Sequence, residues 1–203
     1  MEKLPQNQDL DLIFLIDRSG SMYGSEDDTI GGFNSFIEKE RKKEFNTNVT
    51  TILFDHEYEM LYKRKSINDV DPLTREEYFV RGSTALLDAI GKTITSLDKE
   101  IDNKVLFVIT TDGKENASIE FSKAQISNMI KNHSWEFIFI GADIDSYSEA
   151  GHLGIRKSRV ANYRKSAEGV ERMFNSVENA TMHLRKNRDL EDYNWKRELD
   201  EYD

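Results

Sequence analysis

Three short apolar runs constrain the fold of this 203-residue chain more than any other feature of its sequence. The runs are Asp11–Asp17, Lys104–Thr110 and Trp135–Ile140, and Val, Ile, Leu and Phe dominate each of them. Runs of this length and composition are typical of strands buried on both faces of a parallel sheet. Between them lie stretches such as Ala85–Leu97, in which apolar residues recur at helical spacing. Because strands alternate with helices, the sequence predicts an α/β domain.

The remaining periodic segments extend this α/β pattern. Two further strands, Asn48–Phe54 and Tyr58–Tyr62, flank an acidic turn and form a hairpin-like pair, which predicts one antiparallel edge strand in a mostly parallel sheet. The right-handed crossover rule places helices on both faces of that sheet. Further helices are predicted over Thr29–Lys43, Ser118–Lys131, Ser146–Leu153 and Glu168–Arg185, and a last short strand over Val160–Tyr163.

Composition excludes several classes of function. The chain has no cysteine, which excludes disulfides, thiolate metal sites and cysteine nucleophiles. Its formal net charge of −10 argues against an extended nucleic-acid surface, whereas its carboxylates suit a hard cation such as Mg²⁺. No apolar run approaches the ~18 residues of a membrane span. The N-terminus has no apolar core of a secretion signal, so we expect a cytoplasmic protein without a membrane partner.

Length and charge together predict one domain with two short flanks: an N-terminal extension over residues 1–8, the domain over 9–186, and an acidic C-terminal end over 187–203. The fifteen residues Asp189–Asp203 carry a net charge of −5, which is half of the total. A solvated helix end with a frayed tail explains this charge, and a partner-binding or self-masking tail is the alternative. Trp195 lies among these charges, and we expect it to dock back on the domain.

Carboxylates and hydroxyls gather where the predicted strands end. Asp17 closes the first apolar run and is followed by Ser19 and Ser21, while Asp112 follows the run Lys104–Thr110. Ligands of open α/β sheets bind outside the carboxyl ends of the strands. Thr84, at the start of a predicted helix, is a third hydroxyl candidate. Since Mg²⁺ takes about six oxygen ligands, these residues predict a metal site.

In this order the residues resemble the von Willebrand factor A domain family with its metal-ion-dependent adhesion site. The family pattern is Asp-x-Ser-x-Ser after the first strand, a Thr in a later loop and Asp-Gly after the fourth strand, and the resemblance covers roughly residues 9–186. It implies a Rossmann-like, doubly wound fold that binds Mg²⁺ or Mn²⁺. The implied metal residues are Asp17, Ser19, Ser21, Thr84 and Asp112, with the serines and in some states the threonine as direct ligands and the aspartates often acting through water.

The resemblance also implies how such a site works. Two aspartates leave a divalent cation attractive to a further carboxylate, and in the family an Asp or Glu of a partner protein commonly completes the coordination. We therefore expect a protein-binding module without catalysis. The segments Arg81–Gly91 and Thr110–Ser118 look like those of stand-alone intracellular bacterial and phage-type members, some of them associated with tellurium-resistance and stress-response gene neighbourhoods. The partner and the oligomeric state stay open.

The main alternative is a Mg²⁺-dependent hydrolase of the phosphatase type with Asp17 as nucleophile. Those enzymes carry Asp-x-Asp, whose second carboxylate is the acid/base, and here that position is Ser19. The chain also lacks the Gly-rich phosphate loops of nucleotide-binding enzymes and the Gly-x-Ser-x-Gly frame of serine hydrolases. Taken singly, Ser19 and Ser21 also fit ordinary turn residues, and Thr84 fits a helix N-cap.

Residues around the predicted site have simpler roles as alternatives. Arg18 and Tyr23 are candidates for partner contact, and Asp88 is expected to be solvated or ion-paired. The four histidines show no metal-ligand spacing and are expected to be structural or at the surface. Three further residues have either a rim position or a local role in a loop or helix cap: Glu115, Asn116 and Asp143.

Overall fold

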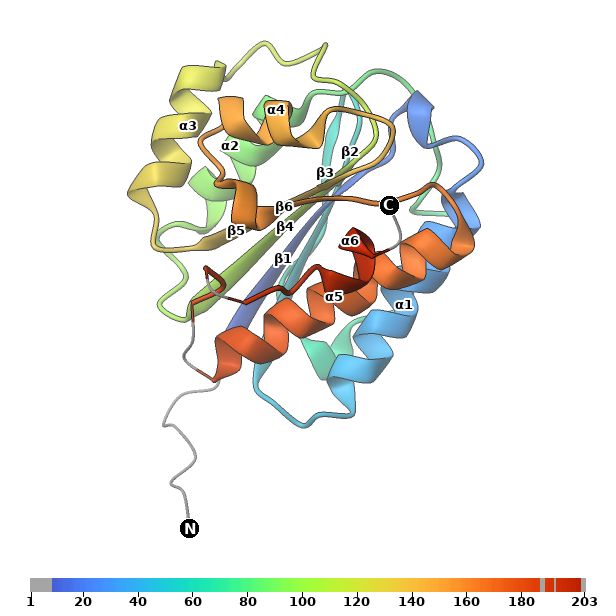
Figure 1. The fold of residues 1–203 in the computed structure, drawn as a ribbon, viewed down its shortest axis with the longest axis vertical. Helices are drawn as coiled ribbons and strands as arrows, with labels where there is room; N and C mark the ends of the chain where they lie inside the picture. Colours follow the sequence, from blue (N-terminus) through green and yellow to red (C-terminus); the bar gives the residue numbers. More distant parts are fainter. Residues whose placement is uncertain (1–8, 187–188, 192, 202–203) are drawn as a thin grey trace.

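The computed structural model describes residues 9–186, 189–191 and 193–201. The predicted N-terminal extension, residues 1–8, lies outside the described part. A six-stranded sheet in the order β3-β2-β1-β4-β5-β6 forms the centre of the molecule (Figure 1). β2 and β3 pair antiparallel, and every other neighbouring pair is parallel. The sheet therefore confirms the predicted mostly parallel α/β fold with one antiparallel edge strand.

The strands match the predicted apolar runs to within a few residues. Their bounds are β1 Leu10–Asp17, β2 Thr47–Phe54, β3 Tyr58–Ser66, β4 Lys104–Thr111, β5 Glu136–Gly141 and β6 Val160–Asn162. All eight residues of β1 are buried, because β2 and β4 flank the strand and helices cover both of its faces.

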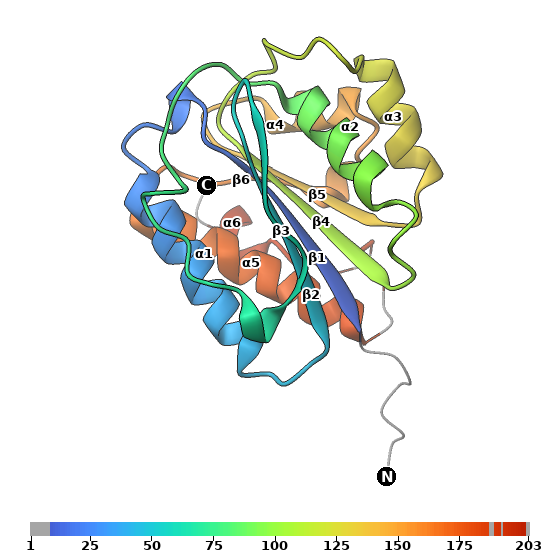
Figure 2. The ribbon, with the colours of Figure 1, turned by 180° about the vertical axis from the view of Figure 1, so that it is seen from behind.

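Two layers of helices cover the sheet (Figures 1 and 2). On one face, α1 and α5 contribute Phe33, Phe36 and Phe174 to a core with Phe14 of β1. On the other face, α2, α3 and α4 pack against the alternate residues of the same strand, such as Ile13. The helix bounds are α1 Glu26–Arg41, α2 Leu86–Leu97, α3 Lys123–Asn132, α4 Ser146–His152, α5 Ala167–Arg185 and α6 Arg197–Asp200.

One predicted helix begins later than expected. The spacing of apolar residues predicts a helix from Ser118, whereas α3 begins at Lys123. Ser122 caps the helix by accepting the Gln125 N–H, and the Gln125 side chain accepts the Ser122 N–H in return. This reciprocal capping box ends the preceding loop at a defined residue.

The C-terminal segment packs on the domain over the residues that are described. Leu190, Trp195 and Leu199 are buried in the core beside α5, and Trp195 Nε1 donates to Ser158 O at 2.9 Å. This confirms the docking expected for Trp195, whereas a frayed tail is wrong for this part. The acidic residues Asp189 and Glu191 are nevertheless exposed, since the apolar side chains alone face inward.

No helix in the described part of the chain combines the length and the apolar character that a membrane span needs.

Candidate metal centre

Asp17 ties the first strand to the fourth at their carboxyl ends. β1 and β4 pair with Ile16 opposite Thr110, so Asp17 and Thr111 reach the same edge of the sheet. Asp17 Oδ1 accepts the Ser19 N–H at 2.6 Å, and Asp17 Oδ2 accepts the Thr111 hydroxyl at 2.5 Å. Both oxygens of this buried carboxyl group are therefore held by neighbours in the chain.

Burial raises the pKa of Asp17 to about 6 from its usual value of 3.8, because the charged form loses its hydration. The hydrogen bonds from Thr111 and Ser19 oppose this shift, and the nearby Asp112 adds to it. Two carboxylates this close to each other favour a bound cation, which would stabilise both in the ionised form.

The three predicted hydroxyls converge beside Gly113. A Cβ atom placed on Gly113 would lie 2.5 Å from Thr84 Oγ1, 3.1 Å from Ser21 Oγ and 3.2 Å from Ser19 Oγ. The hydroxyls of Ser19 and Ser21 are 3.2 Å apart, and Ser21 Oγ donates to Asp112 Oδ1 at 2.5 Å. The fold thus brings together all five residues that the sequence singled out. Thr84 does not serve as a helix cap, since Ala85 holds the N-cap position of α2.

Backbone hydrogen bonds hold the three loops against one another. Gly20 N–H donates to Gly82 O at 3.0 Å, which joins the loop after β1 to the loop before α2. Asn116 N–H donates to Thr84 O at 3.0 Å, and the Asn116 side chain accepts the Thr84 N–H at 2.9 Å. Asn116 therefore has the local loop role that was one of the two predictions for it, and it positions Thr84.

This donor set is suited to a hard cation. Three hydroxyls lie around Gly113, one of them bonded to Asp112, and Asp17 is bonded to the Ser19 N–H. Oxygen is the ligand atom that Mg²⁺ and Mn²⁺ favour. Among the described residues, no group of three or more His, Cys, Asp or Glu side chains could hold a metal ion. A cation site in this part of the chain would therefore need other oxygen ligands as well, and the hydroxyls beside Gly113 are of that kind.

Arg18 is not available for partner contact. Its guanidinium is buried, and Arg18 Nε donates to Asp55 Oδ2 at 2.9 Å while Arg18 Nη1 donates to Glu59 Oε2 at 2.6 Å. The expectation of a partner-facing Arg18 is therefore wrong, because the side chain turns toward β2 and β3. Tyr23, the other candidate, is 81% exposed.

Asp88 and Glu115 organise the loop between β4 and α3. Asp88 was expected to be solvated or ion-paired, but it is buried and accepts the backbone N–H groups of Ile119, Glu120 and Phe121 at 2.9 Å each. Glu115 accepts the N–H of Leu87 in the first turn of α2 at 3.0 Å, so it has a loop role. The two carboxylates join this loop to α2.

The remaining candidates lie at the periphery. Asp143 is exposed with a φ of 54°, and it is not the cap of α4. That cap is Asp145, whose side chain accepts the Ser148 N–H at 3.0 Å. Three of the histidines have local partners: His56 Nδ1 lies 3.1 Å from Asp55 Oδ1, His133 Nε2 lies 2.7 Å from Asp98 Oδ1, and the His183 ring stacks on Tyr193.

Two residues of the cluster were missed by the sequence interpretation. Thr111 directly precedes Asp112, so its place at the end of β4 was visible in the sequence, although its bond to Asp17 was not. Lys165 follows β6, and its ammonium lies 2.7 Å from Asp112 Oδ2 and 2.6 Å from the backbone oxygen of Ser21. No spacing relative to the other residues could have indicated this contact.

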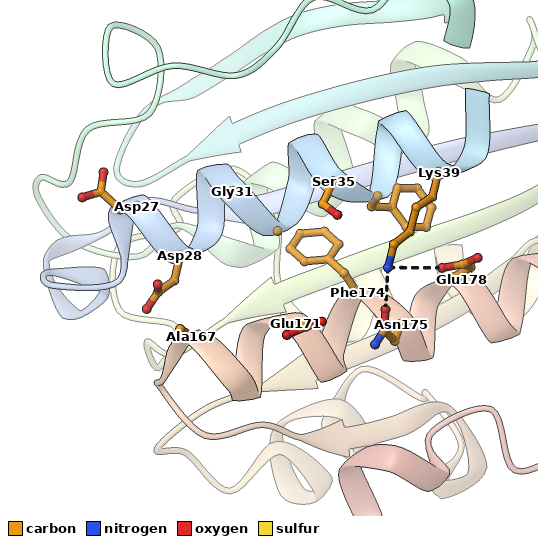
Figure 3. A pocket seen from close by; sticks show the side chains of 12 residues that line it. Asp27, Asp28, Gly31, Ser35, Lys39, Ala167, Glu171, Phe174, Asn175 and Glu178 are labelled. Carbon is orange, nitrogen blue, oxygen red and sulfur yellow. Dashed lines mark hydrogen bonds and ion pairs between the residues drawn. The ribbon is translucent and has the colours of Figure 1, made fainter. Parts of the chain in front are cut away.

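A separate groove of about 270 Å³ lies between α1 and α5 (Figure 3). Acidic side chains line it, including Asp28 and Glu171, together with the aromatic side chains of Phe36 and Phe174. Lys39 crosses it to Asn175 at 3.1 Å. The groove contains none of the predicted metal residues.

The sequence matches no family model and no curated protein. The fold, however, is similar to several solved structures. One is proximal thread matrix protein 1 from the mussel byssus with a zinc-occupied MIDAS motif, at 16% identity and a TM-score of 0.61 over 88% of this chain and 45% of that chain.

Two others support the same fold. The manganese-loaded Plasmodium vivax TRAP protein is 20% identical with a TM-score of 0.60, over 78% of this chain and 69% of that one. A von Willebrand factor type A structure from Catenulispora acidiphila is 15% identical with a TM-score of 0.60, over 86% and 42%. The chain thus has the fold of a von Willebrand factor type A domain, and it spans less than half the length of the mussel and Catenulispora proteins.

Proposed function

We propose that this chain is a metal-dependent protein-binding module, in which Mg²⁺ or Mn²⁺ at the carboxyl edge of the sheet accepts a carboxylate from a partner protein. The observation that carries the proposal is the convergence of the Ser19, Ser21 and Thr84 hydroxyls beside Gly113, with Ser21 bonded to Asp112. Zinc in the MIDAS motif of one structure of the same fold, and manganese bound to another, support a divalent cation in general.

The charge of the site supports an acidic partner group. Asp17 and Asp112 provide two negative charges, which balance a divalent cation without exceeding its charge. Hydroxyl ligands add no charge, so a cation held here would stay attractive to a further carboxylate. When bound, the cation would supply an open coordination position that an Asp or Glu oxygen can fill.

Exposed apolar side chains support a protein partner on the same edge. Among the described residues, the large hydrophobic side chains that are exposed are Tyr23 at 81%, Phe79 at 42% and Ile119 at 92%. Each lies in one of the three loops that carry the proposed metal residues. Apolar contacts around a polar centre are the usual make-up of a protein interface.

The geometry disfavours the alternative, a phosphatase-type hydrolase with Asp17 as nucleophile. Asp17 is fully buried, and each of its carboxylate oxygens already accepts a hydrogen bond. A nucleophile needs an oxygen that can reach the substrate, so the proposal has no catalytic step. The proposed setting, a bacterial or phage protein of the cytoplasm, rests on the resemblance of segments 81–91 and 110–118.

The metal is tested by thermal unfolding of the purified chain in chelator, then in excess Mg²⁺ or Mn²⁺. We expect the metal to raise the melting temperature of the wild type but not of Asp17→Ala. Asp143→Asn serves as the control, because it changes an exposed carboxylate near the same edge at a φ that asparagine tolerates. A wild-type melting temperature that neither metal raises would contradict the proposal.

The mode of binding is tested by affinity purification of partners with Mg²⁺ present and again in excess chelator. We expect chelator to release the partner, and substitution of one acidic residue of the partner to prevent binding. A complex that persists in chelator would rule out the bridging cation. Hydrolysis of a generic phosphate ester that disappears in Asp17→Asn would instead favour the phosphatase.

A further inference from the structure

Lys165 places a positive charge inside the proposed metal centre. The residue lies between β6 and α5, and its ammonium contacts Asp112 Oδ2 at 2.7 Å and donates to Ser21 O at 2.6 Å. The Lys165 side chain is 22% exposed and that of Asp112 is 1% exposed. Water screens the attraction within this pair less than it screens that of a surface pair, because Asp112 is buried.

The contacts of Lys165 coincide with those that a metal would use. Asp112 Oδ1 accepts a hydrogen bond from the Ser21 hydroxyl, whereas the buried Oδ2 is paired with the Lys165 ammonium but accepts no hydrogen bond from the described residues. A buried carboxylate without a compensating charge is costly. Lys165 therefore compensates Asp112 and also joins the loop after β1 to the end of β4.

We propose that Lys165 competes with the divalent cation for Asp112 and thereby sets the metal affinity of the site, an inference that rests on the function proposed above. The ammonium stabilises the metal-free site. Metal binding displaces it from Asp112, so the free energy of that ion pair reduces the net free energy of metal binding.

The displaced ammonium has a place to go. A polar pocket of about 540 Å³ lies next to the centre, and Lys165 is part of its wall. Two acidic residues, Asp143 and Asp145, line the same pocket together with two basic ones, Lys114 and Arg164. The flexible four-carbon side chain of Lys165 can turn into this open space, where its ammonium stays near two carboxylates and water. Its release from Asp112 therefore does not bury the ammonium against apolar side chains.

The first test is a calorimetric titration of the metal-free protein with Mg²⁺ and with Mn²⁺. Lys165→Met and Lys165→Gln remove the charge, and the glutamine amide can still donate a hydrogen bond if the methionine variant does not fold. We expect either variant to bind metal about tenfold or more tightly than the wild type, given the strength of a partly buried charge pair. Lys165→Arg keeps the charge, and we expect its Kd to stay within about threefold of the wild-type value.

Lys43→Met is the matched control. Lys43 is 21% exposed and lies 2.5 Å from Glu40, which is fully buried like Asp112 but sits in α1, where no proposed metal residue lies. This variant is expected to lose stability with no change in metal Kd. Neutral Lys165 variants that bind metal no more tightly than the wild type would overturn the competition, while the metal-binding function would stand.

The second test follows displacement directly. The metal-free and metal-loaded proteins are treated with an amine-acetylating reagent, and acetylation of Lys165 is measured by mass spectrometry. We expect it to rise with metal, and an unchanged rate would overturn the inference. If the neutral variants bind metal and the wild type does not, Lys165 excludes the cation completely, which would also support the competition. Absence of binding by the wild type and by the neutral variants would overturn both the inference and the function.

Discussion

Arg18 Nε lies 2.9 Å from Asp55 Oδ2, and both side chains are almost completely buried although Arg18 is the residue next to Asp17. The pair connects the proposed metal loop to the turn after β2. Arg81 reaches the same oxygen, Asp55 Oδ2, at 2.9 Å from the loop before α2. Asp55 thus holds two of the loops that form the proposed site.

We predict that Arg18→Met lowers the free energy of unfolding by ~1.5–3 kcal/mol, because the buried Asp55 carboxylate loses one charged hydrogen-bond donor while Arg81 remains. Arg75→Met is the control, since Arg75 pairs with Asp27 where both side chains are more than half exposed. Such a surface pair contributes ~0–1 kcal/mol. Urea unfolding at neutral pH measures both, and equal losses would contradict a structural role for Arg18.

The raised pKa of Asp17 predicts the pH dependence of the metal-free protein. The folded state holds this proton up to about pH 6, whereas the unfolded chain releases it near 3.8. The contribution of Asp17 to stability is therefore fully present below pH 3.8 and is lost as the pH rises through about 6. The loss is on the order of 3 kcal/mol.

Asp17→Asn should abolish this dependence, because asparagine has no titrating group. Its amide oxygen can still accept the Ser19 N–H, and its amide nitrogen can donate to Thr111 Oγ1 in a bond of reversed direction. The measurement is urea unfolding in chelator from pH 4 to 8, with the wild type and Asp17→Asn compared at each pH. Curves that run parallel would show that Asp17 does not titrate in this range.

Gly113→Ala is predicted to abolish the metal response. The new methyl group would lie 2.5 Å from Thr84 Oγ1 and would separate the three hydroxyls. Gly31→Ala is the matched control, since a Cβ there meets nothing within 4 Å and the residue lies on the exposed side of α1. It should stabilise the protein by ~0.5–1 kcal/mol and retain the full thermal shift with Mg²⁺.

Asp88 is predicted to control the order of the loop between β4 and α3. Asp88→Ala removes the acceptor of three backbone N–H groups, and a hydrogen bond to a charged group contributes ~1.5–3 kcal/mol. Limited proteolysis should then cut the chain near Ile119, which is already 92% exposed. Asp88→Asn retains an oxygen acceptor and should be cut more slowly than the alanine variant. Equal resistance of wild type and Asp88→Ala would contradict this role.

Trp195 is predicted to attach the C-terminal segment to the domain. Its side chain is fully buried, so Trp195→Ala should cost ~3–5 kcal/mol. Trp195→Phe keeps most of the apolar surface but loses the hydrogen bond to Ser158 O. It should lower the free energy of unfolding by about 1 kcal/mol relative to the wild type. Thermal unfolding distinguishes the two, and a harmless alanine substitution would show that the segment does not contribute to stability.

The sequence by itself determined the strands, the alternation with helices and the five residues that meet at the carboxyl edge of the sheet. The strands and helices follow from periodicity along the chain, and parallel strands bring the residues after their carboxyl ends, here Asp17 and Asp112, to one edge. Thr84 instead precedes α2, and its place at a helix start and the family resemblance indicated it. Asp17, Ser19 and Ser21 were visible because one short segment carries all three.

Only the tertiary structure decided the partners of the charged residues. Arg18 turns inward to Asp55, Asp88 holds the loop before α3, and Lys165 lies on Asp112. Each contact joins segments far apart in the chain, such as Lys165 and Ser21, which are separated by 144 positions. The spacing of apolar residues along a segment indicates its backbone conformation and which of its faces is buried. The partner of a charged side chain depends on where the fold places an opposite charge, and a single sequence contains no period from which that can be read.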